Sequence, residues 1–162
     1  MKSRFVKVLG VAYGAMLAMV SVVAPAPAAN INTNATECQA QFWPQEADII
    51  HTEKGISTDS TVTSSRWISC SVPRQPLATD ATSGSFYVDG DAQNGAWMVC
   101  SLASYDYTGT FLGSYSLTSP GPAFDFLITL PTAQLGYWAY TGITCVLPPN
   151  GNGTLRGVTS IQ

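Results

Sequence analysis

The stretch Phe124-Asp125-Phe126-Leu127-Ile128-Thr129-Leu130 shows the clearest strand periodicity in the chain. Every second residue from Phe124 to Leu130 is a large apolar residue, and two of the three residues between them are polar. An apolar period of two indicates a β-strand with one buried face. Pro131 follows at once and ends the run, because proline cannot donate to a ladder of strand hydrogen bonds.

Similar short apolar runs lie on both sides of this stretch, with glycine, proline and asparagine between them. The runs are Arg66–Val72, Ser85–Val88, Ala96–Ser104, Thr110–Leu117, Gly136–Leu147 and Leu155–Ile161. No window carries an apolar stripe of helical period. Short strands at regular spacing with such turns predict an all-β fold, a single antiparallel β-sandwich that is Ig-like or jelly-roll-like.

The region before Arg66 is harder to interpret. Asn30 to Thr36 is polar, and we expect a mobile start there. A short strand is expected around Asp48 to His51. Ala96–Ser104 is apolar on both faces, which favours a strand in the middle of a sheet.

The first 28 residues have the composition of a secretory signal peptide. Three basic residues open the chain, an uncharged apolar run follows from Val8 to Val23, and Ala26 and Ala28 form an A-x-A cleavage pattern. The apolar run is shorter than the roughly 20 residues of a membrane-spanning helix. We therefore expect residues 1–28 to be a signal peptide, residues 29–162 to form one domain, and the protein to be exported to an extracellular or periplasmic space.

Charge excludes one class of partner. Four of the seven basic residues and all ten acidic residues follow Ala28, which leaves a net charge of −6 on the expected domain. Proteins that bind nucleic acid neutralise phosphates with lysine and arginine. We therefore expect no nucleic-acid partner and no membrane span after signal removal, whereas a glycan or protein partner stays open.

The four cysteines, Cys38, Cys70, Cys100 and Cys145, predict disulfides. An even number in an exported domain is typical of a disulfide framework, and gaps of 30 residues or more do not fit the close pairs of a zinc site. Three pairings are possible. Cys70, Cys100 and Cys145 each have apolar residues two positions away, which places them on buried strand faces. We favour Cys38–Cys70 and Cys100–Cys145.

Catalytic signatures are scarce. His51 is the only histidine, so a Ser-His-Asp triad would have to include it, and no serine lies in a G-x-S-x-G turn. A glycosidase needs only two carboxylates, for which Asp89 with Asp91, or Asp106 with Asp125, are candidates. We expect no catalytic residue among these, although the question of an enzyme stays open.

Asp89 and Asp91 also resemble the start of a calcium-binding loop, with alternating oxygen ligands. Position twelve of such a loop, where glutamate would bind the ion, is Cys100 here, so the segment has too few oxygen ligands for calcium. We favour a turn at Asp89-Gly90 and predict no metal ion and no cofactor.

Aromatic residues are plentiful and could provide a platform on which sugar rings stack. The candidates follow one expected strand or lie at the start of another: Tyr105, Tyr107, Tyr137, Trp138 and Tyr140. The alternative is that the aromatic residues, including the four tryptophans, fill the core and form cross-strand pairs, and we favour it.

The cysteine-bearing segments resemble uncharacterised small secreted bacterial proteins with four cysteines. The segments that carry the resemblance are Cys38, Cys70-Ser71-Val72-Pro73-Arg74, Tyr87-Val88-Asp89, Cys100-Ser101-Leu102, Tyr107-Thr108-Gly109 and Cys145-Val146-Leu147-Pro148. Such proteins more often have proline directly after the second cysteine, where this chain has Ser71. The resemblance implies a two-disulfide β-sandwich and no functional residue.

Three classes of function remain. We favour a non-catalytic structural or interaction domain. The alternative is a carbohydrate-binding module or an adhesin or pilin-like subunit, which would carry exposed aromatic rings or an open groove for a partner's strand. A small secreted hydrolase would need a cleft with His51 or two acids of perturbed pKa.

Overall fold

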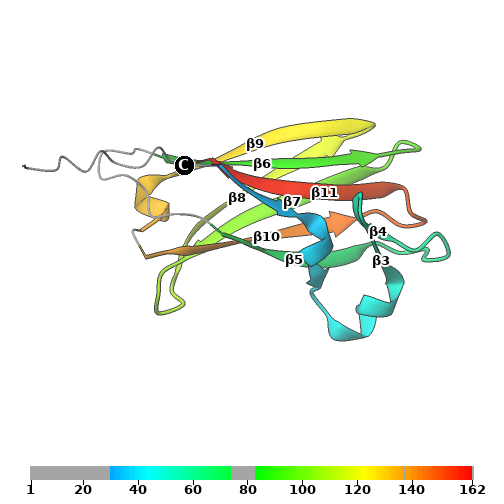
Figure 1. Ribbon diagram of the computed structural model, residues 1–162, viewed down its shortest axis with the longest axis horizontal. Coiled ribbons are helices and arrows are strands. Elements are labelled where there is room, and N and C mark those ends of the chain that lie inside the picture. The colour runs from blue at the N-terminus through cyan, green and yellow to red at the C-terminus, as the bar shows by residue number, and fades with distance from the viewer. Residues whose placement is uncertain (1–29, 74–82, 137, 162) are drawn as a thin grey trace, which may run out of the picture.

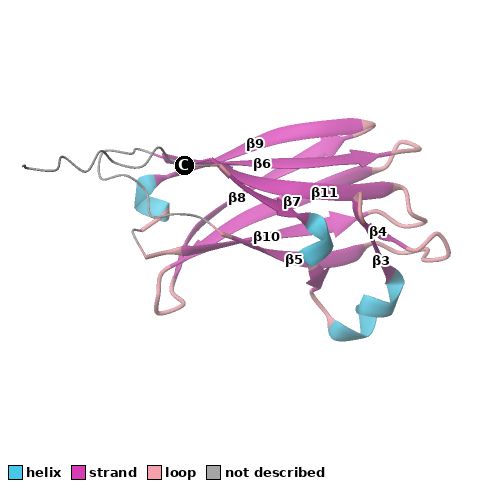
Figure 2. Ribbon diagram, viewed as in Figure 1, coloured by secondary structure: helices cyan, strands magenta, loops and turns pink. Residues whose placement is uncertain are grey.

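A computed structural model describes residues 30–73, 83–136 and 138–161. The expected signal peptide and Tyr137 lie outside the described residues. The chain forms two antiparallel sheets that pack face to face, as Figure 1 shows. Figure 2 shows the short 3-10 helices at the margins of these layers.

The first sheet, called sheet A here, has the strand order β3-β4-β11-β6-β9, and β1 also pairs with β11. Its strands are β1 (Ile31–Asn34), β3 (Ile49–Thr52), β4 (Gly55–Thr58), β6 (Ser83–Ala92), β9 (Ala123–Pro131) and β11 (Gly153–Ile161).

The second sheet, sheet B, has the order β2-β5-β10-β7-β8. Its strands are β2 (Gln39–Ala40), β5 (Arg66–Val72), β7 (Trp97–Tyr105), β8 (Phe111–Pro120) and β10 (Tyr140–Leu147). From β4 to β11 the chain changes sheet at every connection except that from β7 to β8. This is the eight-stranded jelly-roll arrangement, which confirms the predicted antiparallel sandwich.

Three 3-10 helices connect strands: η1 (Ala35–Glu37), η2 (Trp43–Asp48) and η3 (Thr132–Gln134). Within the described residues, no helix is long and apolar enough to cross a membrane. Neither sheet, in the part of the chain described, lacks an interior strand, so the open groove expected of a pilus subunit is not seen there.

The core lies between the sheets and follows the period of two. Alternate residues of β5, β7, β10 and β6 are buried, while the residues between them are exposed or half-buried. The largest fully buried side chains include Phe86, Ile68, Met98, Leu102 and Leu155. At about 1.5–3 kcal/mol for each large apolar side chain, this burial is the main term that holds the sheets together.

Both disulfides lie in sheet B. Cys100 of β7 and Cys145 of β10 are directly opposite each other in the ladder and are bonded. Cys38, just before β2, is bonded to Cys70 of the neighbouring β5. This is the pairing favoured from the sequence, and it joins neighbouring strands of one sheet rather than the two sheets.

Two sequence expectations about the backbone were wrong. The expected mobile start is strand β1, because Asn32 and its neighbours pair with β11. The expected turn at Asp89-Gly90 is part of β6, which continues to Ala92. The turn lies at Asn94-Gly95 instead, where both residues have positive φ (54° and 71°) and the Ala96 amide donates to the Gln93 carbonyl. Two positive φ angles are the geometry of a type I′ turn.

Candidate functional site

The solvent-facing surface of sheet B carries several of the exposed aromatic rings. Because Cys70, Cys100 and Cys145 point into the core, the residues between the buried positions of β5, β7 and β10 face solvent. We call this surface the outer face of sheet B. It has an aromatic end, a middle of small residues and a tryptophan end.

The aromatic end is a cluster of three rings on three neighbouring strands. Tyr140 of β10, Tyr105 of β7 and Phe111 of β8 are consecutive partners across the ladders. The rings of Tyr105 and Tyr140 are stacked, with centroids 5.6 Å apart and an interplanar angle of 18°, and Phe111 meets Tyr105 edge-on at 5.8 Å. Tyr140 and Phe111 are about half exposed, so the cluster presents ring surface to solvent.

The hairpin between β7 and β8 extends this cluster. Asp106 closes the turn, since its Oδ1 atom accepts hydrogen bonds from the amides of Thr108 and Thr110 and from the Thr108 hydroxyl. These bonds, led by the one from the Thr108 side chain, lower the pKa of Asp106. Tyr107, 78% exposed, lies within the turn so formed. Asp106 therefore serves to hold the turn, and it is not paired with Asp125, which lies on sheet A.

Two tryptophans lie at the other end of the face. Trp67 of β5 is opposite Val146 of β10, and Val146 is opposite Val99 of β7. Trp97 begins β7, two residues before Val99. Trp67 and Trp97 are 44% and 56% exposed.

Small residues fill the middle of the face in two cross-strand rows. The members are Ser71, Gly142, Ala103 and Ser114 in one row, and Ser69, Thr144, Ser101 and Ser116 in the other. The Ser101 and Ser116 hydroxyls lie 2.6 Å apart. This middle, called the floor here, is low in profile and rich in hydroxyl groups.

The preference for core packing of the aromatic residues was wrong for the tryptophans. Trp43, Trp67, Trp97 and Trp138 are between 44% and 85% exposed, and the core is built mainly from aliphatic residues with Phe86. Of the platform candidates, the structure brings Tyr105 and Tyr140 together and places Tyr107 on the adjoining hairpin. Trp138, 69% exposed, lies in the connection before β10, and Tyr137 is outside the described residues.

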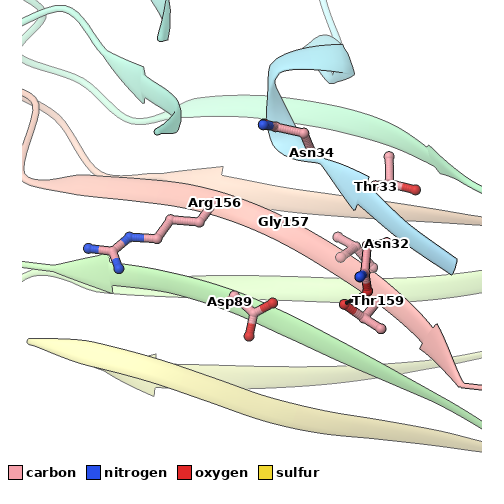
Figure 3. A pocket seen from close by; sticks show the side chains of 8 residues that line it. Asn32, Thr33, Asn34, Asp89, Arg156, Gly157 and Thr159 are labelled. Atoms are coloured by element: carbon pink, nitrogen blue, oxygen red, sulfur yellow. Dashed lines mark hydrogen bonds between the residues drawn. The ribbon is translucent and has the colours of Figure 1, made fainter. Parts of the chain in front are cut away.

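Sheet A presents a different outer face, which is polar and charged. Asp89 and Asp91 of β6, Asp125 of β9 and Arg156 of β11 lie there, and Arg156 donates to Asp91 over 2.8 Å. Figure 3 shows Asp89 on β6 beside Arg156 and Thr159 on β11, with Asn32 and Asn34 on β1 across β11. These residues line a shallow hollow of about 420 Å³.

Asp89 is directly opposite Asp125 across the ladder. Partial burial raises the pKa of Asp89, and the negative charge of Asp125 and a side-chain hydrogen bond with it raise the pKa further, while Arg156 acts in the opposite direction.

The described residues support neither a metal site at Asp89 and Asp91 nor a catalytic triad at His51. Asp91 is paired with Arg156, and the described residues contain no group of three or more His, Cys, Asp or Glu side chains that could hold a metal ion. His51 has its two ring nitrogens 3.0 Å from the Thr36 carbonyl and 2.9 Å from a Glu46 carboxylate oxygen. Glu46 in turn accepts from the Ala40 amide. His51 thus joins η1, η2 and β3 as a structural residue.

No protein-family model matches this chain, and no curated protein sequence matches it. Among solved structures it is similar to the CBM36-1 domain of a multidomain xylanase from the hindgut metagenome of Trinervitermes trinervoides, with 11% identity, a TM-score of 0.49, and coverage of 82% of this chain and 96% of that one. It is also similar to the xylan-binding module CBM15, with 9% identity, a TM-score of 0.44, and coverage of 83% and 96%.

A third similar structure is TmCBM61 in complex with β-1,4-galactotriose. The identity is 12%, the TM-score is 0.35, and the match covers 82% of this chain and 83% of that one. At these identities and TM-scores, the similarities assign no function to this chain.

Proposed function

We propose that this domain binds carbohydrate, without catalysis, on the outer face of sheet B, and that it does so outside the cytoplasm. The observation that carries the proposal is the stacked Tyr105–Tyr140 pair at one end of a hydroxyl-lined floor, with Trp67 and Trp97 at the other end. Exposed aromatic rings gathered on one face of a domain are a mark of an interaction site.

The chemistry of the face suits sugars. A sugar ring has a flat face of C–H groups and a rim of hydroxyl groups. Aromatic rings offer large apolar surfaces for the first, and tyrosine and serine hydroxyls offer hydrogen bonds to the second. Of the two non-catalytic interpretations that the sequence left open, this geometry favours a carbohydrate-binding module.

The rigidity of sheet B also supports a binding role. The Cys100–Cys145 bond joins the two strands that carry Tyr105 and Tyr140, so the two rings stay in register when no ligand is present. A site that is already ordered pays less conformational entropy on binding. Disulfides also fit a domain that works in an oxidising space outside the cytoplasm.

The test is binding to a panel of insoluble and soluble polysaccharides, measured by pull-down and by isothermal titration. We expect binding to at least one polysaccharide and a loss of about tenfold for Tyr140→Ala, since one aromatic contact is worth up to about 1.5 kcal/mol. Tyr87→Ala is the matched control, because Tyr87 is a half-buried tyrosine on the outer side of β6 in sheet A. Absence of any glycan binding, or equal losses in both variants, would contradict the proposal.

A further inference from the structure

We infer that the ligand is an uncharged linear polysaccharide whose chain runs along β10 and β7, from the Tyr105–Tyr140 stack to Trp67 and Trp97. This inference rests on the proposed function and adds to it the class of the ligand and its direction on the sheet. Three features of the outer face of sheet B carry it: the spacing of the two aromatic ends, the low floor between them, and the lack of charge.

The two ends are separated along the strands, not across them. Tyr140 and Val146, the partner of Trp67, are six residues apart on β10. At about 3.3 Å per residue this is a separation of about 20 Å. Trp97 is eight residues from Tyr105 on β7, or about 26 Å by the same rise. A monosaccharide cannot contact both ends, whereas an extended chain of several sugars can.

The cross-strand rows decide the direction. The row of Tyr140, Tyr105 and Phe111 is aromatic, and the next two rows contain only small residues. A chain lying across the strands would meet the rings of one end only, either the row of Tyr140, Tyr105 and Phe111 or the tryptophan end. Only a chain lying along β10 and β7 meets both ends and passes over the floor.

The floor lets such a chain lie close to the backbone. Gly142 and Ala103 face each other in one row, and Thr144 and Ser101 in the next. None of these side chains is long enough to lift a sugar off the sheet. Their hydroxyl groups are placed to accept and donate hydrogen bonds to the rim of a sugar ring.

Charge selects the class of polysaccharide. Among the described strand positions that face outward on sheet B, none carries a formal charge. Polymers of uronic acids are recognised by arginine or lysine, which pair with each carboxylate. The described outer-face arginine, Arg156, lies on sheet A and is already paired with Asp91. An uncharged polymer therefore fits the face better than an acidic one.

The tryptophan end opens into a hollow of about 280 Å³. Trp97 and Val146 form its border with the outer face, and Asn94, Asn152 and Pro148 line it further out. The amide of Asn94 donates to the amide oxygen of Asn152 over 2.7 Å. A polymer that reaches Trp97 can therefore extend into this hollow, where it contacts further uncharged polar groups.

The test is isothermal titration of the protein with uncharged β-1,4-linked gluco-, manno- and xylo-oligosaccharides, from the disaccharide to the hexasaccharide, and with polygalacturonate. We expect affinity for one uncharged series to rise with length by about tenfold or more once both ends are reached, since each ring contact adds up to about 1.5 kcal/mol. Polygalacturonate should bind more weakly than the uncharged hexasaccharide.

Variants separate this inference from the proposed function. Trp67→Ala combined with Trp97→Ala should lower the affinity for the hexasaccharide to that for the short oligosaccharide and leave the short one unchanged. Trp67→Phe with Trp97→Phe should restore most of the loss, and thermal melts will confirm folding. Tyr140→Ala should weaken both lengths.

Equal binding of short and long oligosaccharides, or tighter binding of polygalacturonate, would overturn the inference and leave the proposed function standing. If no glycan binds, both fall. Dimerisation that the tryptophan substitutions abolish would identify a second copy of the chain as the occupant and would also overturn both.

Discussion

The outer faces of the two sheets are built on the same backbone geometry and carry opposite chemistry. Sheet B presents aromatic rings, hydroxyl groups and no formal charge at its described outward strand positions, and it contains both disulfides. Sheet A presents Asp89, Asp91 and Asp125 with Arg156. Three carboxyl groups of the domain thus lie on the outer face of sheet A, whereas the outward strand positions of sheet B offer rings and hydroxyl groups.

The largest effect on stability is expected from removing the disulfide between β7 and β10 of sheet B. Replacing Cys100 and Cys145 together by alanine removes a bond that closes a separation of 45 residues. The chain-entropy model gives a loss of roughly 4 kcal/mol in the free energy of unfolding. Urea unfolding followed by tryptophan fluorescence measures it. The control replaces Ser101 and Ser116 by alanine, which removes a hydrogen bond between β7 and β8 but no covalent bond. Similar midpoints for the two variants would show that the disulfide does not set the stability of sheet B.

The sequence predicted much of the jelly roll and part of the candidate site, since it named Tyr105, Tyr107 and Tyr140 but not Trp67, Trp97 or Phe111. Strand Arg66–Val72 has the expected bounds, and the strand around Phe124–Leu130 is longer by one residue at each end. The early strands β1, β2 and β4 were missed because they are four residues or fewer and polar, so they are stabilised by their partners and not by local propensity.

One available signal would have located the aromatic face. If Cys70, Cys100 and Cys145 point inward, residues at odd offsets from them point outward. Trp67 and Trp97 are three residues before Cys70 and Cys100, and Tyr140 is five before Cys145. What the sequence could not give is strand order, because only the ladders place Tyr105 beside Tyr140 and Trp67 beside Val146.

A charge introduced at the floor of sheet B tests whether the uncharged surface of this sheet is needed for binding. Thr144→Arg would place a long cation in the middle of the floor, where it obstructs a bound chain. We expect a loss of about tenfold or more in affinity for an uncharged oligosaccharide, which corresponds to about 1.4 kcal/mol, measured by titration. Thr129→Arg makes the same change at an exposed strand threonine of sheet A. That control should bind as the wild type does, and a matching loss there would argue that binding is not confined to sheet B.

A smaller effect is expected from the acidic pair of sheet A. Because the pKa of Asp89 is raised in the folded state, the folded protein holds this proton more tightly than the unfolded chain. Stability should therefore fall as pH rises above 3.8, the ordinary pKa of aspartate, and stay reduced at neutral pH. Asp89→Asn removes the like-charge pair and should stabilise the protein at pH 7 by less than about 1 kcal/mol.

Thermal melts of wild type and Asp89→Asn across this pH range provide the measurement. The difference between the two proteins should shrink as pH falls below 3.8, since the wild-type carboxyl group is then protonated in both states. Glycan binding at pH 7 should be the same in both. A stability difference that does not change with pH would show that the charge of Asp89 is not the cause.

The smallest effect, and one of opposite sign, is expected at Asp106 on the side of sheet B. The hydrogen bonds from Thr108 and Thr110 lower the pKa of this carboxyl group, so its contribution is present above pH 3.8 and is lost as pH falls through the lowered value. Asp106→Ala removes the acceptor for the amides of Thr108 and Thr110, and amide hydrogen exchange at these two positions should become faster. Asp106→Asn keeps a side-chain carbonyl in the same place and should preserve the slow exchange, because asparagine makes the same turn. Since Tyr107 lies in this turn next to the Tyr105–Tyr140 stack, Asp106→Ala should also weaken glycan binding slightly, and Asp106→Asn should not. Equal rates of amide exchange in the two variants would mean that the backbone alone holds the turn.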